Sequence, residues 1–260
     1  RSQMKYQHID HISAQPLVES YRHHFIVQNT PQRPVTRDEM DGIYALPYER
    51  AYHPMYLSLG HILAIEEVKF SIISNRGCYG GCSFCALTYH QGRIMQSRSK
   101  ESIVEEAVKI TQDPDFKGYI HDIGGPTANF YDVACGKQVD KGVCLHKQCV
   151  SDKACSLLQV SHKNYLDILR EVRALDGIKK VFVRSGIRYD YVLYDNDESF
   201  FNELVEHHVS GQLKVAPEHV SDRVLEVMNK PKQELYDTFV KRFYEINKKQ
   251  NKNTFLVPYL

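Results

Sequence analysis

Short apolar runs alternate along this chain with segments whose apolar residues recur at helical spacing. The runs that favour β-strands cover residues 69–74, 118–124, 180–185, 212–216 and 254–260, and most of them end at Gly, Ser or Pro. Strands that alternate with amphipathic helices predict an α/β fold with parallel strands and helical crossovers. In such folds, ligand sites lie at the carboxyl ends of the strands.

Five segments between these strands have one apolar face. The first covers residues 99–110, where Ser99 is a suitable N-cap for a helix with Ile103 and Ala107 on its apolar side. The same spacing recurs in four further sets, Leu166-Leu169-Val172, Phe201-Leu204-His208, Val224-Leu225-Met228 and Leu235-Phe239-Phe243-Ile246. We expect these helices to pack on parallel strands that are closed, or partly closed, into a barrel.

Two regions do not follow this alternation. Residues 1–62 are rich in His, Gln, Tyr and Pro, and their prolines would interrupt any long helix or strand. We therefore expect an irregular segment that is the tail of an upstream N-terminal region, followed by a core over residues 63–260. Residues 126–160, approximately, form a cysteine-containing insertion with no helical or strand pattern, which predicts its own stabiliser or function.

Composition narrows the class of protein. The 260 residues are 42% hydrophobic and 25% charged, which indicates a folded chain with a sizeable core rather than a disordered one. The 33 basic and 32 acidic residues give no net field that would attract nucleic acid or an anionic membrane, although a local basic patch is not excluded. Without a membrane-length apolar stretch or a signal peptide, we expect a cytoplasmic protein. The chain starts at Arg1 and stops at Leu260 inside an apolar run, so we expect a piece of a longer protein.

Seven cysteines carry the strongest chemical signal. They form two groups, first Cys78, Cys82 and Cys85, then Cys135, Cys144, Cys149 and Cys155. In a reducing compartment such cysteines are more often ligands than disulfides. The first group is a CxxxCxxC pattern directly after an expected strand, and three nearby thiolates favour a soft metal. An iron–sulfur cubane ordinarily takes four cysteines, so three would leave one iron open, whereas a zinc site would need a distant fourth ligand.

The second cysteine group matches no standard short metal motif. Its members are separated by eight, four and five residues, with His146 nearby. Four thiols in a polar insertion without another stabiliser predict structural zinc or an auxiliary iron–sulfur cluster. The alternative is free cysteines, or a local disulfide formed on exposure to air.

The cysteine pattern, with Phe84 just before its last member and an expected strand just before its first, resembles the signature of the radical SAM superfamily. Residues 70–77, 123–129, 186–190 and 214–219 resemble, more closely, the YgiQ-like radical SAM proteins. The resemblance implies a partial (β/α) barrel and a 4Fe-4S cluster that cleaves S-adenosylmethionine to a 5′-deoxyadenosyl radical. It also implies an external electron donor such as flavodoxin or ferredoxin.

The resemblance also suggests roles for residues around the cofactor. Phe84 would pack near the adenine. Gly124 and Gly125 would accept from the methionine amino group through their carbonyls, with Thr127 as a further acceptor, because Pro126 replaces the Glu that often follows two glycines here. The alternative for the two glycines is a tight turn after the strand.

The ends of the third and fourth expected strands supply the remaining candidates. Arg188, with Ser185 beside it, is the expected anchor of the cofactor carboxylate or of the substrate, since guanidinium pairs well with carboxylate. An ion pair between Arg188 and Asp190 is the structural alternative. Glu218 would bind the ribose hydroxyls, whereas a hydrogen-bonded structural role is favoured for His219.

No residue pattern indicates the substrate. Two other functions stay open, a non-catalytic zinc-binding module that binds protein or RNA, and methyl or methylthio transfer to RNA or protein. Several lysines between residues 241 and 252 suggest a solvated helix face and do not exclude nucleic acid as a partner.

Overall fold

The computed structural model describes residues 10–60 and 62–260, so residues 1–9 and 61 of the expected N-terminal segment lie outside the described residues. The helices are α2 (Arg37–Tyr44), α3 (Leu63–Val68), α4 (Leu87–Gln91), α5 (Lys100–Thr111), α6 (Gly136–Lys141), α7 (Lys163–Arg173), α8 (Tyr189–Tyr194), α9 (Ser199–Glu203), α10 (Asp222–Met228) and α11 (Gln233–Lys249), with a 3₁₀ helix η1 (Pro54–Leu59) and a π-helix η2 (Leu204–His208). The strands are β1 (Leu17–Tyr21), β2 (His24–Gln28), β3 (Ser71–Ile73), β4 (Asn75–Arg76), β5 (Gln96–Ser97), β6 (Tyr119–Ile120), β7 (Asp122–Gly124), β8 (Lys180–Val181), β9 (Gln212–Val215) and β10 (Phe255–Pro258).

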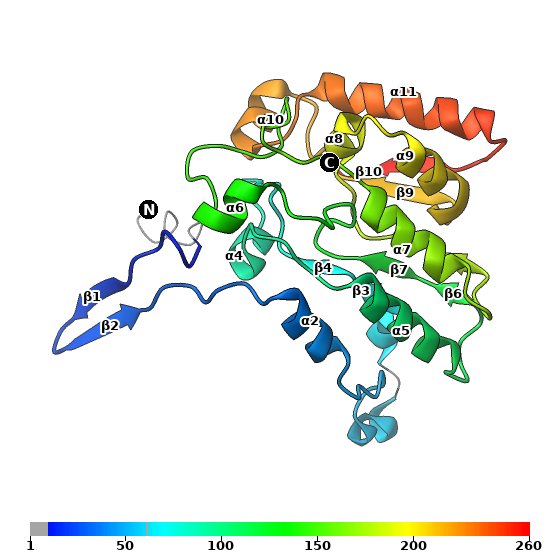
Figure 1. Cartoon of the computed structure of the whole chain (residues 1–260), viewed down its shortest axis with the longest axis horizontal. Coiled ribbons are helices and arrows are strands. Elements are labelled where there is room, and N and C mark those ends of the chain that lie inside the picture. Colours follow the sequence, from blue (N-terminus) through cyan, green and yellow to red (C-terminus); the bar gives the residue numbers. More distant parts are fainter. Residues whose placement is uncertain (1–9, 61) are drawn as a thin grey trace.

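Parallel strand pairs form the centre of the molecule. Strand β3 pairs with β7, β6 with β8, and β9 with β10, each pair parallel. Further backbone contacts connect the pairs, from Ile123 N to Phe182 O at 3.3 Å and through a parallel bridge between Ile187 and Val215. The α/β expectation is therefore confirmed, with helices between β5 and β6, β7 and β8, β8 and β9, and β9 and β10 (Figure 1). The described residues form no closed barrel, and a partial barrel stays a prediction.

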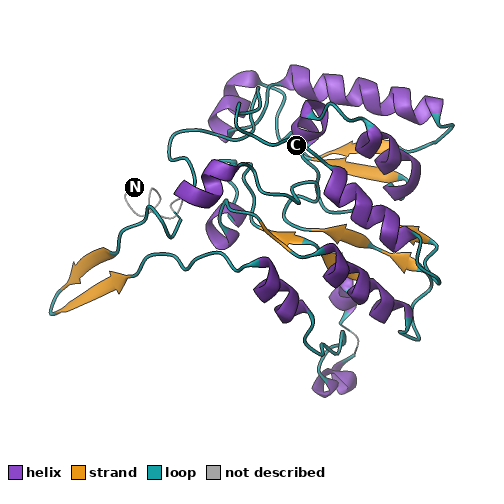
Figure 2. Ribbon diagram, viewed as in Figure 1, coloured by secondary structure: helices purple, strands orange, loops and turns teal. Residues whose placement is uncertain are grey.

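Alternation along the parallel strands separates a buried face from a polar one. Ile72, Ile123 and Leu213 are at most 1% exposed, and they join one core with side chains of α5, α7 and α11. Their sequence neighbours Ser71 and Asp122 line a cavity on the opposite face. Figure 2 shows the helices of this core on the outer side of the strands. The burial of the apolar face thus leaves the polar face available to a ligand.

The expected elements are present, with shorter strands than the sequence suggests. Helix α5 begins as predicted, because the Ser99 hydroxyl accepts from Ser102 N at 3.0 Å. The other four helical segments are also confirmed, although the one over residues 201–208 ends in the π-helix η2. The run over residues 118–124 is divided at His121 into β6 and β7, and the strand expected at 180–185 is assigned only over β8.

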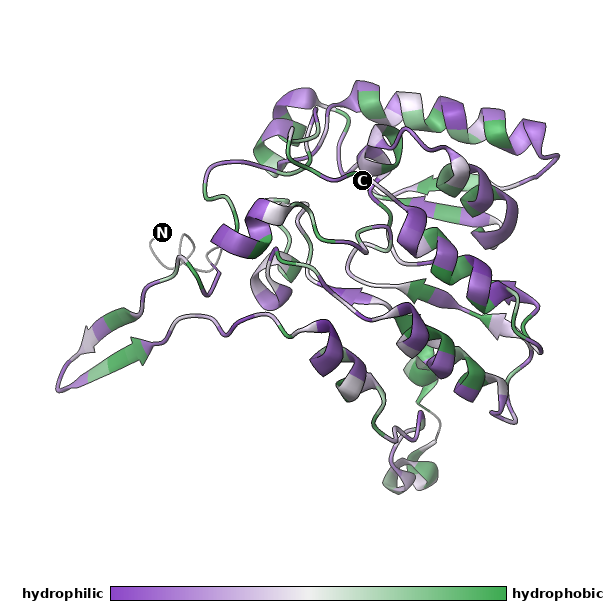
Figure 3. Ribbon diagram, in the orientation of Figure 1, coloured by the Kyte–Doolittle hydropathy of each residue, from purple (hydrophilic) through white to green (hydrophobic). Residues whose placement is uncertain are grey.

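The N-terminal segment contains short elements that its prolines do not prevent. Strands β1 and β2 form an antiparallel hairpin that extends away from the body, with exposed apolar side chains such as Phe25 (Figures 1 and 3). Helix α2 has a capping box between Thr36 and Glu39. Met40 of this helix is buried, and Asp41 accepts from Ser99 N at 2.9 Å. This part of the segment is therefore packed on the core.

The insertion at residues 126–160 was expected to have no helical pattern, and this expectation is wrong at α6, which occupies six residues within it. The Asp10 carboxylate accepts from Val143 N, which connects the insertion to the N-terminal segment.

Among residues 10–60 and 62–260, no helix combines the length and the apolar character that crossing a membrane requires.

Candidate functional site

The loop that contains Cys78, Cys82 and Cys85 directly follows β4. At its start, Gly77 N donates to Gln91 Oε1 at 3.1 Å, and Cys78 N donates to Gly92 O at 3.0 Å. Gly77 has φ +87°, and a side chain there would collide with the carbonyl of Ile94. Only glycine allows this close approach, so the loop starts in a fixed position against the segment after α4.

The other side of the loop is held by the end of α10. Ser83 donates its N–H to Met228 O at 3.1 Å and its hydroxyl to Val227 O at 2.7 Å. Asn229 Nδ2 donates to Gly81 O at 3.3 Å. Segments more than 140 residues apart in the chain thus fix the backbone of the cysteine loop.

A cluster of three aromatic side chains packs the cysteine loop against the insertion. Tyr79 stacks on Phe130 with ring centroids 3.8 Å apart, and Tyr191 meets both rings edge-on. These three side chains are at most 2% exposed and pack with Val150. The residue after the first cysteine is therefore a core residue, which sequence spacing alone did not indicate.

The three thiols are half-buried and unpaired with one another. Burial raises the pKa of the Cys78 thiol, and its contact with the Thr127 hydroxyl at 3.5 Å lowers it only in part. A buried thiol that resists ionisation needs a cationic partner to become a thiolate, and a metal is the usual one. Thr127 thus contacts a cysteine, and its expected role as an acceptor for the methionine amino group stays a prediction.

Arg188 lies beside these thiols and forms the ion pair with Asp190 that was its structural alternative, while its expected role as an anchor of the cofactor carboxylate stays a prediction. Its Nη1 is 3.5 Å from Cys82 Sγ, while Nε and Nη2 donate to the Asp190 carboxylate at 2.8 and 2.5 Å. Burial lowers the pKa of Arg188, but the ion pair with Asp190 outweighs it and raises that pKa well above its usual value. A methyl group on Gly80 would lie 2.7 Å from Nη1, so the glycine admits the guanidinium.

This arrangement fits an iron–sulfur cluster better than a single ion. Within residues 10–60 and 62–260, no three His, Cys, Asp or Glu side chains gather closely enough to hold one metal ion. In a cubane each cysteine binds a different iron, so its thiolates need not share one centre. Three thiols on one eight-residue loop, with two glycines between them and a buried cation alongside, satisfy that requirement.

Gly124, the last residue of β7, and the following Gly125 are both tightly packed. A side chain at Gly125 would lie 2.6 Å from Asn75 O, and one at Gly124 would overlap the Ser185 side chain. The close approach of neighbouring strands therefore already requires both glycines. Their expected contact with the methionine amino group stays a prediction.

Ser185 is held by a residue that sequence reasoning missed. Its hydroxyl donates to the carboxylate of Asp122, which also accepts from Arg184 N at 2.7 Å. Burial raises the pKa of Asp122 despite these hydrogen bonds. Asp122 and Ser185 line a polar cavity of about 420 Å³ together with Lys214. The only hint in the sequence was an acid within an otherwise apolar strand.

The remaining candidates lie at the ends of the strands or on the cysteine loop. The Phe84 side chain is 50% exposed and therefore accessible to a ligand. Glu218 has φ +74°, and its N–H donates to Tyr259 O at 3.0 Å. His219 Nδ1 accepts from Ser221 N at 2.8 Å, which agrees with the structural role favoured for it.

Lys230 is a second residue that the sequence did not single out. It is 6% exposed, and its Nζ donates to Ala216 O at 2.5 Å. Burial lowers the pKa of Lys230, and the neighbouring Arg188 lowers it further. Arg188 and Lys230 are thus two buried basic side chains in the electrostatic environment of Cys82.

The second cysteine group is held together without converging on one ion. Cys155 N donates to Cys149 O at 3.0 Å, and Lys137 Nζ contacts Cys144 Sγ at 3.5 Å. Burial raises the pKa of the Cys149 thiol, the positive charge of Arg93 lowers it, and the other three cysteines raise it further. The four thiols are thus near enough to interact electrostatically. A zinc ion or second cluster on them stays a prediction.

Comparison with known proteins identifies the family. Residues 1–71 match a model described as "Radical SAM N-terminal", and residues 72–259 match "Radical SAM superfamily". A "UPF0313 protein" of Clostridium botulinum (strain Okra / Type B1) is 59% identical over 257 residues, covering 99% of this chain and 40% of the relative. A "UPF0313 protein" of Clostridium perfringens (strain SM101 / Type A) is 56% identical, covering 99% and 39%. The chain thus spans about two fifths of these relatives, and the resemblance to YgiQ-like proteins is confirmed. The chain belongs to the radical SAM superfamily.

Proposed function

We propose that this chain contributes the catalytic core of a radical SAM enzyme that cleaves S-adenosylmethionine reductively. The observation that carries the proposal is the cysteine loop, fixed on one side by Gln91 and Gly92 and on the other by the end of α10, with a buried guanidinium beside Cys82. Such positioning holds three thiols in place before any metal binds.

In this proposal Cys78, Cys82 and Cys85 hold the 4Fe-4S cluster. When bound, the reduced cluster supplies the electron that divides the sulfonium into methionine and a 5′-deoxyadenosyl radical. The protein positions the reactants and excludes water. Phe84, whose side chain is exposed, is proposed to pack against the adenine, and the Gly125 carbonyl to accept from the amino group of the cofactor. The Gly124 carbonyl already accepts from Ser74 N at 2.7 Å and from the Ser74 hydroxyl at 3.2 Å, so it is less available for this role.

We assign the cofactor carboxylate to the part of the cysteine loop that lies beside Arg188. Arg188 keeps its charge there because Asp190 pairs with it, and the buried Lys230 lies nearby. Ser185 and Glu218 are proposed to face the ribose. The contact between Thr127 and Cys78 favours a supporting role for Thr127, namely orienting the thiol.

The substrate would bind on the polar face of the strands, within a partial (β/α) barrel. We propose an external cytoplasmic electron donor, such as flavodoxin or ferredoxin. Because the chain spans only about two fifths of its relatives, the substrate and partners of the whole protein depend on further sequence as well.

The test is anaerobic reconstitution with iron and sulfide, reduction with dithionite in the presence of S-adenosylmethionine, and chromatography for 5′-deoxyadenosine. Cys82→Ala should abolish product formation, whereas the matched control Cys155→Ala, in the second cysteine group, should retain it. An intact cluster that forms no 5′-deoxyadenosine, in this chain and in a full-length relative, would refute the proposal. A colourless protein that carries only zinc would instead support the binding-module alternative.

A further inference from the structure

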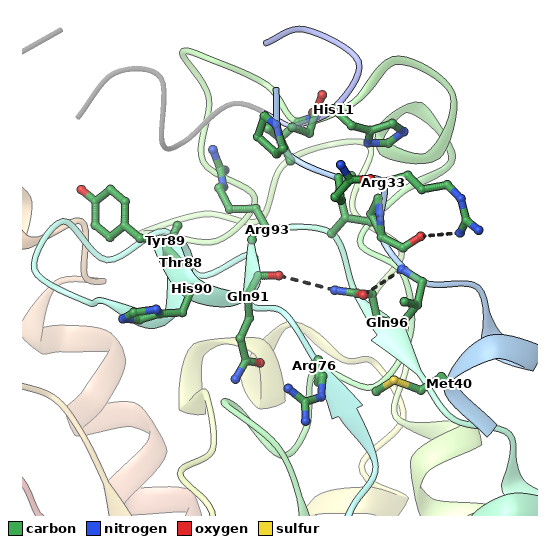
Figure 4. A pocket seen from close by; sticks show the side chains of 18 of the residues that line it. His11, Arg33, Met40, Arg76, Thr88, Tyr89, His90, Gln91, Arg93 and Gln96 are labelled. Carbon is green, nitrogen blue, oxygen red and sulfur yellow. Dashed lines mark hydrogen bonds between the residues drawn. The ribbon is translucent and has the colours of Figure 1, made fainter. Parts of the chain in front are cut away.

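A second cavity lies between the N-terminal segment and residues 88–96, which contact the start of the cysteine loop. It has a volume of about 520 Å³, in the range of small-molecule sites, and its walls come from residues 31–44 and 88–96 (Figure 4). From its volume and its uncompensated positive charge, we infer that this cavity binds a phosphate ester of about mononucleotide size.

The charged groups around this cavity leave an excess of positive charge. Arg33, Arg76 and Arg93 line it, against one acid among the described lining residues, Asp10. Arg33 is neutralised by Glu39, whose Oε2 lies 2.7 Å from its Nη1. Asp10 accepts from the backbone N–H groups of residues 12, 13 and 143. Within the described part of the chain, Arg76 and Arg93 have no carboxylate partner, so their charge remains available to an anion.

Arg93 places a fixed positive charge in the cavity wall. It is 7% exposed, and its two terminal nitrogens donate to Cys144 O at 3.1 Å and Lys147 O at 3.3 Å. Its Nε has no partner among residues 10–60 and 62–260, but this atom has almost no accessible surface, so a ligand in the cavity does not reach it. Arg93 therefore contributes charge to the cavity and not a free donor.

Arg76 supplies the accessible guanidinium of this cavity. It is exposed, and its hydrogen bond to the Tyr44 hydroxyl is long, at 3.4 Å. A phosphate group has several acceptor oxygens, and guanidinium binds it in a two-pronged manner. A phosphate ester therefore suits the accessible guanidinium of Arg76 together with the uncompensated charge of Arg93.

The cavity shares its wall with the cysteine loop. Gln91 lines the cavity, and its side chain accepts from Gly77 N, while the adjacent Gly92 accepts from Cys78 N. A ligand that orders residues 88–96 should therefore stabilise the start of the loop as well. Thermal unfolding gives a second readout of binding, which needs neither iron nor cofactor.

The experiment is isothermal calorimetry on the 260-residue chain with uridine 5′-monophosphate, uridine and inorganic phosphate. A pyrimidine is used because an adenine nucleotide could enter the proposed cofactor site. We expect uridine 5′-monophosphate to bind and uridine to bind at least tenfold more weakly, since charge-assisted hydrogen bonds are lost. Inorganic phosphate binding as tightly as the nucleotide would support the anion site and identify phosphate itself as the ligand.

Arg76→Gln should weaken nucleotide binding about tenfold or more without unfolding the protein, because Arg76 is exposed. Arg93→Gln should do the same, with circular dichroism to verify its fold. The matched control is Arg242→Gln on α11, outside the cavity, which should leave binding unchanged. No binding below millimolar concentration, equal binding of uridine, or wild-type affinity in the folded Arg76→Gln variant would overturn the inference.

Discussion

The buried pair of Arg188 and Asp190 allows the sharpest quantitative test of this structure. The two side chains are 6% and 0% exposed, and two hydrogen bonds of 2.8 and 2.5 Å join them. Removing one partner leaves the other charge buried without compensation, which typically costs about 3–5 kcal/mol. We therefore expect Arg188→Met to lower the free energy of unfolding of the metal-free protein by about 3–5 kcal/mol.

The control is Arg184→Met, four residues earlier. The Arg184 side chain is 47% exposed, and its contact with Glu67 is 3.5 Å long. Exposed pairs of this kind contribute about 0–1 kcal/mol, so this variant should unfold nearly as the wild type does. Both variants are compared by urea unfolding at pH 7, followed by circular dichroism under reducing anaerobic conditions.

A double variant separates the pair from simple packing. Arg188→Met combined with Asp190→Leu removes both charges, and replacing a buried ion pair by apolar groups is often neutral or stabilising. The double variant should thus recover most of the stability that Arg188→Met loses. If Arg188→Met costs less than about 1 kcal/mol, or if the double variant is the less stable of the two, the reasoning from burial is refuted.

Three other predictions address the loop, the pH dependence of folding and the second cysteine group. Gly77→Ala should destabilise the protein and prevent cluster assembly, because the positive φ of Gly77 and a nearby carbonyl exclude a side chain. The control Gly42→Ala, which has open space in α2, should instead stabilise the protein by about 0.5–1 kcal/mol. Urea unfolding measures the stability of both variants, and visible absorption measures their cluster content. Burial lowers the pKa of His208 to about 4, so between about pH 6.5 and pH 4 only the unfolded chain takes up this proton and stability is lost as the pH falls. The His208→Asn variant should lose about 2 kcal/mol less than the wild type from pH 7 to pH 5, and equal losses would contradict this. If the second group holds metal, replacing Cys149 and Cys155 by Ser should lower the metal content beyond the first cluster while its brown colour persists; unchanged metal content would exclude them as ligands.

The parallel strands were predictable because each is a short apolar run, but their lengths were not. Backbone N–H groups of Arg184 and Ser185 donate to the Asp122 carboxylate instead of a neighbouring strand. Phe182 N and Val183 N still donate to backbone carbonyls, so the side chain replaces backbone partners only over the last two residues of the expected strand, which the apolar pattern does not reveal. The hairpin of β1 and β2 was missed for a related reason. Its turn at Arg22 takes φ +52° without the Asn or Gly that usually marks such a turn.

The cysteine loop was predictable because its ligands are close in sequence, whereas its electrostatic surroundings were not. Arg188 comes from a position 106 residues after Cys82, and its contact with that thiol could not be foreseen from the sequence, whereas its ion pair with Asp190, two residues away, could. Lys230 follows the end of α10, where a lysine is normally solvated. Its direction is set by Asn229 in the left-handed conformation and by the carbonyl of Ala216, which only the fold brings within reach.

The segment over residues 87–97 connects the two sites that this structure suggests. On one side it accepts hydrogen bonds from Gly77 and Cys78, and on the other it lines the cavity that contains Arg93. Arg93 in turn holds the carbonyl of Cys144, and Gln96 accepts from Val35 N at 3.0 Å. The N-terminal segment and the insertion therefore reach the cysteine loop through the same short stretch of chain. A change of order at residues 87–97 must then alter the position of Cys78 and the shape of the cavity together, so cluster stability and nucleotide affinity should vary in parallel among variants of this segment.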